Sequence, residues 1–490
     1  MLKMSQIDSL LTFIKKKNRR TKLVYAASIL IFIITAIFST GYHHYDEHFQ
    51  ILEFAGLKLN LIAAQNLPWE YLYQIRPAVQ PAMVVVLYRF FHLLGIESPF
   101  LIAFLFRLLS AALAFLSMHM IYKMYKDTIA NETLQKWFLV LSFFLWFAMY
   151  SGVRFSSENW SGSIFIIAFV LLNRKLYQNR FSYLFIGLLL GLSFLCRFQT
   201  AFLIFGLIMF FFFIKKERWN SVLLVLGVSI MFAAGILIDR WYYGKWTLSI
   251  LNYYVENILH HRAADFGVQP WWFYFYDVFI RTIPPGSIII VLSFILVFIY
   301  RRKDALTWTI IPFLLIHCIF AHKETRFMFP LIGFVPVVLI RSIEIIQERW
   351  DKAVLQKKYI GVLVKIFLIV NFIFLAIIAF KPANNQISLY HQVYFDYPGP
   401  TIFYSTANNP YNNIYFYRRP NLEEIEVKSV DDIEKVPGKT QLFVTDDINV
   451  AKSIKLPNQL IYTTFPRWLL KFNFNHWQDR TSCWYLFKLY

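Results

Sequence analysis

The chain has 490 residues, of which 58% are hydrophobic, 19% are aromatic and only 16% are charged. Soluble domains carry about 25% charged residues, and a soluble chain as apolar as this one could not cover its surface. The net charge of +20 does not indicate nucleic-acid binding, because most basic residues lie in short loops between apolar segments, where they set the orientation of a membrane protein.

The apolar segments predict an all-α polytopic membrane protein with about eleven transmembrane helices. In chain order they cover residues 23–40, 99–122, 137–152, 160–173, 181–196, 198–214, 220–238, 285–300, 305–320, 327–343 and 359–380. A basic stretch at residues 15–20 precedes the first segment, and no small-residue cleavage site follows it. We therefore expect an uncleaved first span.

Basic residues occupy every second loop between these segments. They lie at residues 15–20, Lys123 and Lys126, Arg174 and Lys175, Lys215 and Lys216, 301–303 and 349–358. The positive-inside rule places these loops in the cytoplasm. The alternate loops are then extracytoplasmic, namely 41–98, 153–159, the turn at Arg197, 239–284, 321–326 and the chain after 380.

This parity requires one apolar segment not to span the membrane. Residues 82–95 number about fourteen and include Arg89 and His92, so we interpret them as a helix lying along the membrane surface. Residues 47–64 have apolar side chains at three- and four-residue spacing. The first outer loop, 41–98, is therefore predicted to contain two interfacial helices.

The composition changes after residue 380. Short β-rich runs at 401–405, 441–445, 460–464 and 483–487 surround an acidic stretch, 430–436, that we interpret as a helix. We expect two domains, a transmembrane domain over 1–380 and a small extracytoplasmic α/β domain over 381–490. The three cysteines, Cys196, Cys318 and Cys483, are too few and too scattered for a disulfide framework or a metal site.

The first polar cluster on the predicted outer side is His44-Tyr45-Asp46-Glu47-His48, directly after the first span. Adjacent carboxylates at a membrane surface are costly to desolvate, which makes them functional candidates. They could instead be the solvated N-terminus of a helix, where the helix dipole favours acidic residues. The two histidines are four residues apart and could hold a metal, but no further ligand is in place, so no metal is expected.

The second cluster is His322-Lys323-Glu324-Thr325-Arg326, between two predicted spans. A histidine and two cations at the bilayer surface suit an anionic phosphate, because arginine can bind its oxygens with a planar fork and lysine can act as a point charge. The alternative is an internal ion pair of Glu324 with either cation.

Further polar and aromatic residues face the same side. Trp69, Glu70 and Arg76 lie between the two interfacial helices, Arg107, Arg154 and Arg197 lie within or at the outer ends of spans, and Asp239, Trp241-Tyr242-Tyr243, Asn252, Asn257 and Pro270-Trp271-Trp272 lie in loop 239–284. A buried arginine faces a bundle interior or a water-filled cavity, and for Arg107 the alternative is a structural pair with Glu158 or Asp239. The aromatic residues suit sugar rings, or form an interfacial belt.

Five of these segments resemble the signatures of glycosyltransferase family 22, which includes dolichyl-phosphate-mannose-dependent α-mannosyltransferases of N-glycan and GPI-anchor assembly. His44 to Glu53 is similar to His-Pro-Asp-Glu-x-Phe-Gln-x-x-Glu, with Tyr45 in place of proline, and His322-Lys323-Glu324-x-Arg326-Phe327 is similar to the second signature. Trp69-Glu70-Tyr71 with Arg76-Pro77, Asp239-x-x-Tyr242-Tyr243-Gly244 and Pro270-Trp271 follow the same order, and together they cover about residues 41–345.

The resemblance implies a GT-C architecture and an inverting transfer of a sugar, most simply mannose, to a hydroxyl of a glycan or glycolipid acceptor. Nucleotide sugars are cytoplasmic whereas the candidate residues are outside, so a polyprenyl-phosphate sugar is the expected donor. Asp46 would act as the base and Glu47 would orient the acceptor or hold Asp46. His322, Lys323 and Arg326 would bind the donor phosphate. The residues expected to bind substrate are His44, Trp69, Glu70, Arg76, Tyr243 and Trp271.

No cofactor, metal or nucleic acid is expected, and membrane lipid is an expected partner. The richness in Lys, Ile, Asn and Phe favours a bacterial homologue in the inner membrane, and a eukaryotic one would lie in the endoplasmic reticulum. Two alternatives remain open. One is a related GT-C transferase that modifies a lipid with another sugar. The other is a transporter, although inverted repeats and midplane polar residues are not evident.

Overall fold

The computed structural model describes residues 19–174, 179–350, 358–406, 414–419, 421–447, 449–450, 454, 456–478, 481 and 483–490. The chain forms two compact units. The helical unit comprises the described residues of Met1–Ile37, Trp69–Met83 and Leu105–Phe380. The mixed unit comprises those of Phe38–Pro68, Val84–Phe104 and Lys381–Tyr490. The expected domain boundary near residue 380 stays a prediction, and the basic residues at 15–18 and Lys175 lie outside the described residues.

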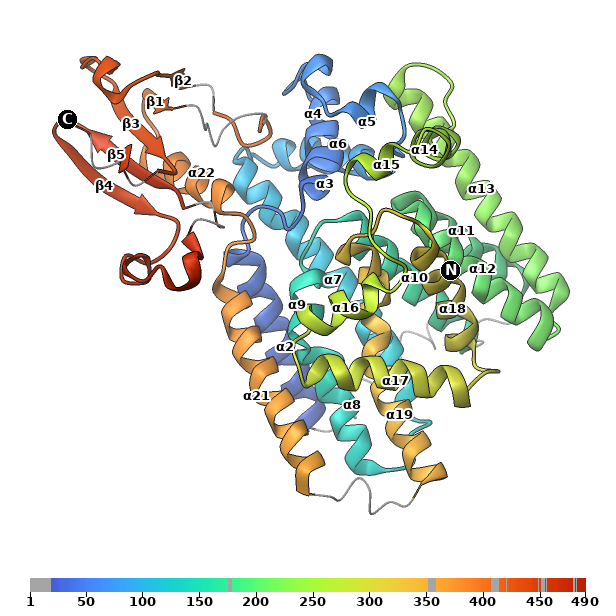
Figure 1. Ribbon diagram of the computed structural model, residues 1–490. Helices are drawn as coiled ribbons and strands as arrows, with labels where there is room; N and C mark the ends of the chain where they lie inside the picture. The colour runs from blue at the N-terminus through green and yellow to red at the C-terminus, as the bar shows by residue number, and fades with distance from the viewer. Residues whose placement is uncertain are drawn as a thin grey trace. The chain divides into compact units, whose positions relative to one another are not determined.

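Each of the eleven predicted apolar segments is helical over most of its length (Figure 1). The helices of these segments are α2 Arg19–Phe38, α7 Pro99–Lys126, α8 Glu132–Phe144, α9 Trp146–Gly152, α10 Ser157–Asn173, α11 Arg180–Cys196, α12 Ala201–Met209, α13 Arg218–Tyr243, α17 Gly286–Tyr300, α18 Ala305–Ile319, α19 Val335–Arg349 and α21 Lys358–Phe380. A π-helical turn, Phe210–Ile214, extends α12, and a 3-10 segment, Thr325–Phe334, leads into α19.

Five helical stretches among the described residues are long and apolar enough to cross a membrane. They are Arg19–Phe38, Pro99–Lys126, Arg218–Tyr243, Thr325–Arg349 and Lys358–Asp396, and the pair α8 and α9, bent by 42°, qualifies as a sixth, broken span. The chain is therefore a multi-pass membrane protein, while the count of eleven spans stays a prediction. Four further helices, α5 Trp69–Leu72, α14 Ser249–Tyr254, α15 Arg262–Asp265 and α16 Phe273–Arg281, lie in the predicted outer loops.

Small residues let the helices of the helical unit approach closely. A Cβ atom added to Gly227 on α13 would lie 2.4 Å from the carbonyl oxygen of Leu184 on α11, and one on Gly206 of α12 would lie 2.1 Å from that of Trp308 on α18. Membrane helices have no hydrophobic driving force between them, so close packing of this kind has a large share in holding them together.

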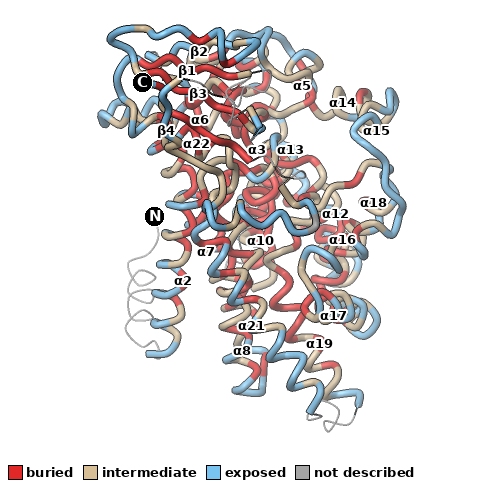
Figure 2. The backbone as a smooth tube through the Cα atoms, turned by 60° about the vertical axis from the view of Figure 1, so that its left-hand side comes forward, coloured by how far each residue is buried: buried red, intermediate tan, exposed pale blue. Residues whose placement is uncertain are grey.

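Helix α10 is the most enclosed part of the helical unit, with 13 of its 17 residues buried (Figure 2). It begins at Ser156, whose hydroxyl accepts a hydrogen bond from the backbone N–H of Asn159 at 3.2 Å. This cap leaves the first turn, including Glu158, fixed at the point where the polar residues of the unit gather.

The mixed unit contains the first of the two helices predicted in the first outer loop and the C-terminal part of the second. Tyr45–Lys58 forms α3 Tyr45–His48, a π-helical turn Phe49–Glu53 and α4 Phe54–Lys58 in direct succession. The second helix, α6, covers Val79–Leu93 and so runs on from the helical unit. Their location at the membrane surface stays a prediction.

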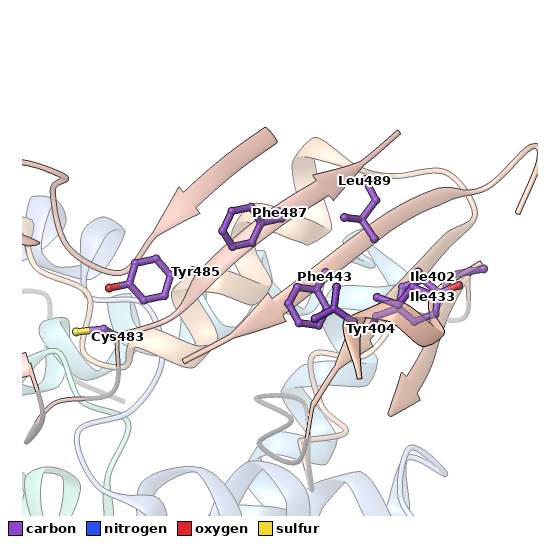
Figure 3. Close-up of a cluster of buried hydrophobic side chains, with 9 residues drawn as sticks. Ile402, Tyr404, Ile433, Phe443, Cys483, Tyr485, Phe487 and Leu489 are labelled. Carbon is purple, nitrogen blue, oxygen red and sulfur yellow. The ribbon is translucent and has the colours of Figure 1, made fainter. Parts of the chain in front are cut away.

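The tail begins with α22 Asn385–Asp396 and folds into a five-stranded sheet in the order β2-β1-β3-β5-β4. The strands are β1 Thr401–Ser405, β2 Leu422–Glu426, β3 Thr440–Thr445, β4 Asn458–Thr463 and β5 Tyr485–Leu489. β2, β1 and β3 are parallel, and β5 is antiparallel to both β3 and β4. Ile402, Phe443 and Phe487 belong to its core (Figure 3).

Four predicted strands are confirmed to within two residues. The fifth, β2, was not predicted because its sequence Leu-Glu-Glu-Ile-Glu suits only a half-exposed edge strand. The helix expected over 430–436 is wrong. Only one 3-10 turn forms there, Val430–Asp432, capped by Ser429. Pro437 disfavours a helical conformation at Val436, and the chain is already extended at Ile433.

The close approach of α11 and α13 predicts a sharp difference between two glycines. Gly227→Leu should lower the free energy of unfolding by about 1–3 kcal/mol, because its side chain would push the two backbones apart. Gly361→Leu on α21 is the matched control, since a Cβ there meets nothing within 4 Å. Thermal unfolding in detergent measures both. Equal midpoints for the two variants would contradict the packing argument.

Candidate active site

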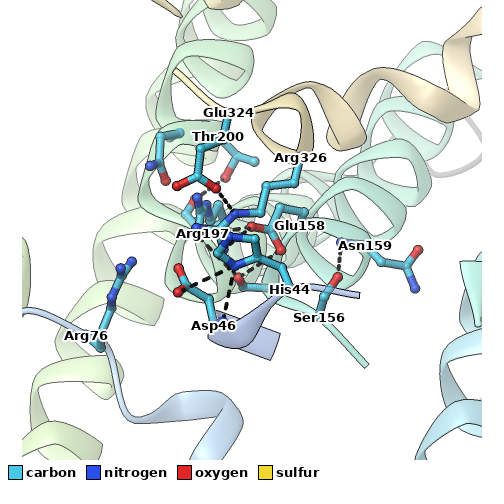
Figure 4. Close-up of polar contacts among 12 residues, drawn as sticks. His44, Asp46, Arg76, Ser156, Glu158, Asn159, Arg197, Thr200, Glu324 and Arg326 are labelled. Atoms are coloured by element: carbon cyan, nitrogen blue, oxygen red, sulfur yellow. Dashed lines mark hydrogen bonds and ion pairs between the residues drawn. The ribbon is translucent and has the colours of Figure 1, made fainter. Parts of the chain in front are cut away.

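A buried carboxylate organises the polar residues of the helical unit. Glu158 lies in the first turn of α10 and is 3% exposed. Its Oε1 atom lies 3.2 Å from Nη1 of Arg197 and 3.3 Å from Nη1 of Arg326 (Figure 4). Two guanidinium groups thus converge on one oxygen atom, in an environment where an unpaired charge would be very costly.

The tight turn between α11 and α12 places Arg197. The residue is extended and is followed by a 3-10 turn, Phe198–Thr200. The hydroxyl of Thr200 donates to the carbonyl oxygen of Arg197 at 2.7 Å, which fixes the turn. The guanidinium lies over the ring of Phe327, 5.0 Å from its centroid. The ion pair of Arg197 with Glu158 was not predicted from the sequence. Arg107, for which Glu158 was considered as a partner, donates its Nε to the carbonyl oxygen of Ala36 at 2.7 Å.

The segment after α18 continues the same network. His322 Nε2 lies 2.9 Å from Glu324 Oε1, and the other oxygen of Glu324 accepts a hydrogen bond from Arg326 Nε. The two segments therefore form one chain of alternating charges, which runs through His322, Glu324, Arg326, Glu158 and Arg197. The internal pair of Glu324 with Arg326 exists, and it is part of this larger network.

Lys323 points elsewhere. Its Nζ donates to the carbonyl oxygens of Gln269, at 3.0 Å, and Phe320. Burial lowers the pKa of this ammonium group. The structure thus brings His322 and Arg326 together but directs Lys323 to the backbone of the neighbouring loop.

Hydrogen bonding to Glu324 is the largest cause that raises the pKa of His322 above its ordinary value, with a further contribution from the carbonyl oxygen of Gly267, 2.9 Å from Nδ1. Burial opposes this shift. His322 consequently keeps its positive charge to a higher pH than an exposed histidine does.

The segment around Arg76 is held by Asp239 and Tyr243, which belong to a different signature segment of the sequence. Tyr243 donates its hydroxyl to the carbonyl oxygen of Arg76 at 2.7 Å, and Asp239 accepts the backbone N–H of Ala78 at 2.7 Å. Arg76 itself lies 3.7 Å from Glu70. The segment that carries Arg76 is therefore tied to the C-terminal end of α13.

The two predicted tryptophans lie in different surroundings. Trp69 stacks on Phe266, with ring centroids 6.0 Å apart and planes at 19°, and Arg262 lies 5.7 Å from the Trp69 ring. Trp271 is 67% exposed. Among the described residues, no group of three or more His, Cys, Asp or Glu side chains is placed to hold a metal ion.

In the mixed unit, the acid pair forms the first turn of α3. His44 caps this helix, and its Nδ1 accepts the backbone N–H of Asp46 at 3.2 Å. His44 Nδ1 also lies 3.6 Å from Asp46 Oδ1. Glu47 accepts the backbone N–H of His43 at 2.9 Å. The helix N-terminus considered from the sequence is thus present, with both acids in its first turn.

Glu158 was considered from the sequence only as a possible partner for Arg107. Its signal was a carboxylate in Ser156-Ser157-Glu158 at the predicted outer end of an otherwise apolar segment. Buried ionisable residues at such a position are functional candidates by default. The sequence does not indicate its partners, Arg197 and Arg326, because they lie in segments about 40 and 170 residues away.

Comparisons with known proteins agree with this architecture. The sequence model of the Alg9-like mannosyltransferase family matches residues 23–418. GPI alpha-1,2-mannosyltransferase 3 of mouse is 26% identical over 321 residues, 63% of this chain and 56% of the relative. The human protein of that name is 26% identical over 318 residues, 63% of this chain and 55% of its own length. This chain thus matches little more than half the length of these relatives.

Among solved structures, ArnT from Cupriavidus metallidurans in the apo state superimposes with a TM-score of 0.52 at 11% sequence identity, over 95% of this chain and 97% of ArnT. At this identity the likeness concerns the fold alone. It confirms the predicted GT-C type of helical membrane fold with a small α/β tail.

The raised pKa of His322 makes the stability of the helical unit depend on pH. A group with a raised pKa in the folded state stabilises fully below its unfolded pKa, about 6.5 for histidine, and this contribution is lost as pH rises through the folded value. The unfolding midpoint of His322→Gln should therefore fall furthest below that of the wild type at acidic pH. In a Glu324→Gln background this pH dependence should become much smaller, because Glu324 is the largest cause of the raised pKa. A difference that is constant from pH 5 to 9 would contradict the assignment.

Proposed function

Because the chain belongs to the Alg9-like mannosyltransferase family, we propose that it transfers mannose from a polyprenyl-phosphate donor to a hydroxyl of a glycan or glycolipid on the non-cytoplasmic face of the membrane. The match over residues 23–418 is the observation that carries this proposal. The named relatives are GPI alpha-1,2-mannosyltransferases, which supports a GPI-like glycolipid as the class of acceptor.

The convergence of Arg197 and Arg326 supports a donor-phosphate site in the helical unit. Their two Nη1 atoms already meet one carboxylate oxygen of Glu158. Phosphate oxygens accept the same fork of guanidinium donors. His322, which keeps its proton to higher pH, adds a third cation. We therefore add Arg197 to the proposed phosphate-binding residues His322, Lys323 and Arg326, with Lys323 in a supporting role through its two carbonyl contacts.

The proposed reaction is a single displacement at the anomeric carbon. The acceptor oxygen forms a bond to the anomeric carbon, and the bond from this carbon to the phosphate oxygen breaks. The electron pair of the broken bond stays on the leaving polyprenyl phosphate, whose negative charge increases by one. Donors aimed at this developing charge stabilise the transition state. Asp46 takes the proton of the acceptor hydroxyl. Glu47, anchored to the backbone of His43, orients that turn.

The remaining proposed residues bind sugar. Trp69 and Trp271 offer aromatic faces, and His44, Glu70 and Arg76 offer polar groups. The hydroxyl of Tyr243 is bonded to the backbone of Arg76, so its proposed part in binding is to hold Arg76 in place.

The phosphate site predicts unequal effects of neighbouring cations. Arg326→Gln and Arg197→Gln should each raise the donor KM about ten- to a hundredfold, the loss expected for one charge-assisted contact of roughly 1.5–3 kcal/mol. Lys323→Met should change it less. The matched control is Arg301→Gln, which removes a partly exposed ion pair with Glu348. Initial rates with purified full-length protein in nanodiscs measure each KM. Wild-type donor KM in both arginine variants would refute the site.

The acid pair predicts a difference between adjacent carboxylates. Asp46→Asn keeps the shape and hydrogen bonding but removes the base, so single-turnover transfer should slow by about 10²–10⁴-fold while donor affinity is retained. Glu47→Gln should be milder. If Asp46→Asn transfers sugar at the wild-type rate and Glu47→Gln is inactive, then Glu47 is the base and Asp46 has the orienting role. Full activity of both variants would show that this turn takes no part in the mechanism.

The sugar that is transferred is identified by assaying the wild-type protein with a panel of polyprenyl-phosphate sugars.

A further inference from the structure

Another buried carboxylate lies in the mixed unit, at a position to which no role has been assigned so far. Glu53, at the end of the π-helical turn, is fully buried at 0% exposure. Its Oε1 atom accepts the backbone N–H groups of Tyr415, at 2.8 Å, and Phe416, at 3.0 Å. The same oxygen lies 2.8 Å from Nε2 of His48. One side-chain atom thus joins the first outer loop to a tail segment 362 residues further along the chain.

This contact is specific because an isolated carboxylate is very costly to bury. Two consecutive backbone N–H groups and an imidazole supply three donors to one oxygen, and hydrogen bonds to an ionised acceptor are about twice as strong as neutral ones. No other residue type of that length presents the same charged acceptor. Glu53 therefore recognises the backbone of residues 415–416 rather than their side chains.

Aromatic rings enclose the same point. His48 is 1% exposed and stacks between Tyr417, with centroids 5.7 Å apart and planes at 9°, and Tyr42, at 5.2 Å and 24°. Tyr417 in turn packs against Phe100, with centroids 4.7 Å apart. The tail segment 415–417 is consequently part of the packed core of the first loop.

The helix that carries these residues also carries the acid pair. Asp46 and Glu47 precede His48 within the single turn of α3, and the π-helical turn Phe49–Glu53 follows without a break. A π-helical turn is rare and frequently marks a functional site. Fixing His48 and Glu53 against the tail therefore fixes the direction in which the first turn of α3 presents its carboxylates.

We infer that Glu53 and His48 are positioning residues, which hold the turn bearing Asp46 and Glu47 in its working orientation by binding the backbone of tail residues 415–417. The tail then contributes to catalysis, because its residues 415–417 help to orient this turn. The inference rests on the proposed function of Asp46, and it assigns to Glu53 a task that does not involve touching either substrate.

Substitutions at Glu53 separate this task from bulk stability. Glu53→Gln keeps the acceptor oxygen for both backbone N–H groups, and a change of tautomer lets His48 pair with the new amide. It should transfer sugar within about threefold of the wild type, because a single neutral hydrogen bond differs from a charged one by a modest amount. Glu53→Ala leaves the two N–H groups without an acceptor. Its kcat should fall about ten- to a hundredfold with the donor KM unchanged.

Hydrogen exchange of full-length protein supplies a readout independent of activity. A peptide covering residues 414–419 should exchange slowly in the wild type and in Glu53→Gln. In Glu53→Ala it should exchange at least about tenfold faster, since breaking one charged contact is worth roughly that factor. The matched control is Glu423→Gln, which removes an exposed pair with Lys439 inside the tail and should alter neither measurement.

The outcomes are distinguishable. A wild-type kcat for Glu53→Ala, or unchanged exchange at 414–419, would overturn the positioning role while the proposed function stands. If Glu53→Ala does not accumulate, Glu53→Asp, which keeps the charge but withdraws it by one methylene, takes its place and should show the same fall in kcat. If the wild type transfers no sugar from any donor tested, the proposed function fails, and the exchange experiment still decides whether Glu53 binds the tail.

Discussion

The helical unit depends on one electrostatic constraint, which is that Glu158 cannot be buried without cations. Helix α10 places this carboxylate in a nearly closed environment, and the turn before α12 and the segment before α19 each bring an arginine to the same oxygen atom. Removing both arginines would leave an uncompensated buried charge, which is far more costly than the loss of a surface pair. Three segments distant in sequence are thereby held in one arrangement.

The same arrangement supports the proposed donor-phosphate site. Two guanidinium groups that meet at one oxygen atom are preorganised for an anion. The fold already holds these two like charges together, so anion binding does not have to overcome their repulsion. Close helix contacts at Gly206 and Gly227 give the rigid support that such a site requires. Polar residues then gather at helix ends and turns, where they avoid contact with lipid.

The mixed unit solves a similar problem by a different means. Glu53 is as deeply buried as Glu158, but its charge is compensated by two backbone N–H groups and a histidine instead of arginines. Backbone donors cannot be exchanged by side-chain substitution, so this contact specifies one segment of the tail by its conformation. A buried carboxylate thus pairs with arginine cations in one unit and binds backbone N–H groups in the other.

Much of this protein follows from its sequence alone. Composition and the lengths of the apolar segments determine a helical membrane protein, because only helices with internally satisfied backbones suit lipid. The alternation of four short β-rich runs identified the tail sheet, and the segments at 44–53 and 322–327 marked the two main polar clusters. These features are local, and local periodicity and residue type are what a sequence displays directly.

Only the tertiary structure decided which polar groups meet. Glu158 joins Arg197 and Arg326, Lys323 turns to backbone carbonyls, and Glu53 binds a tail segment 362 residues away. The edge strand β2 and the short turn at Val430–Asp432 likewise depend on neighbouring strands and on capping rather than on propensity. Pairing of buried charges is set by distances between segments far apart in the chain, and no pattern within either segment records that distance.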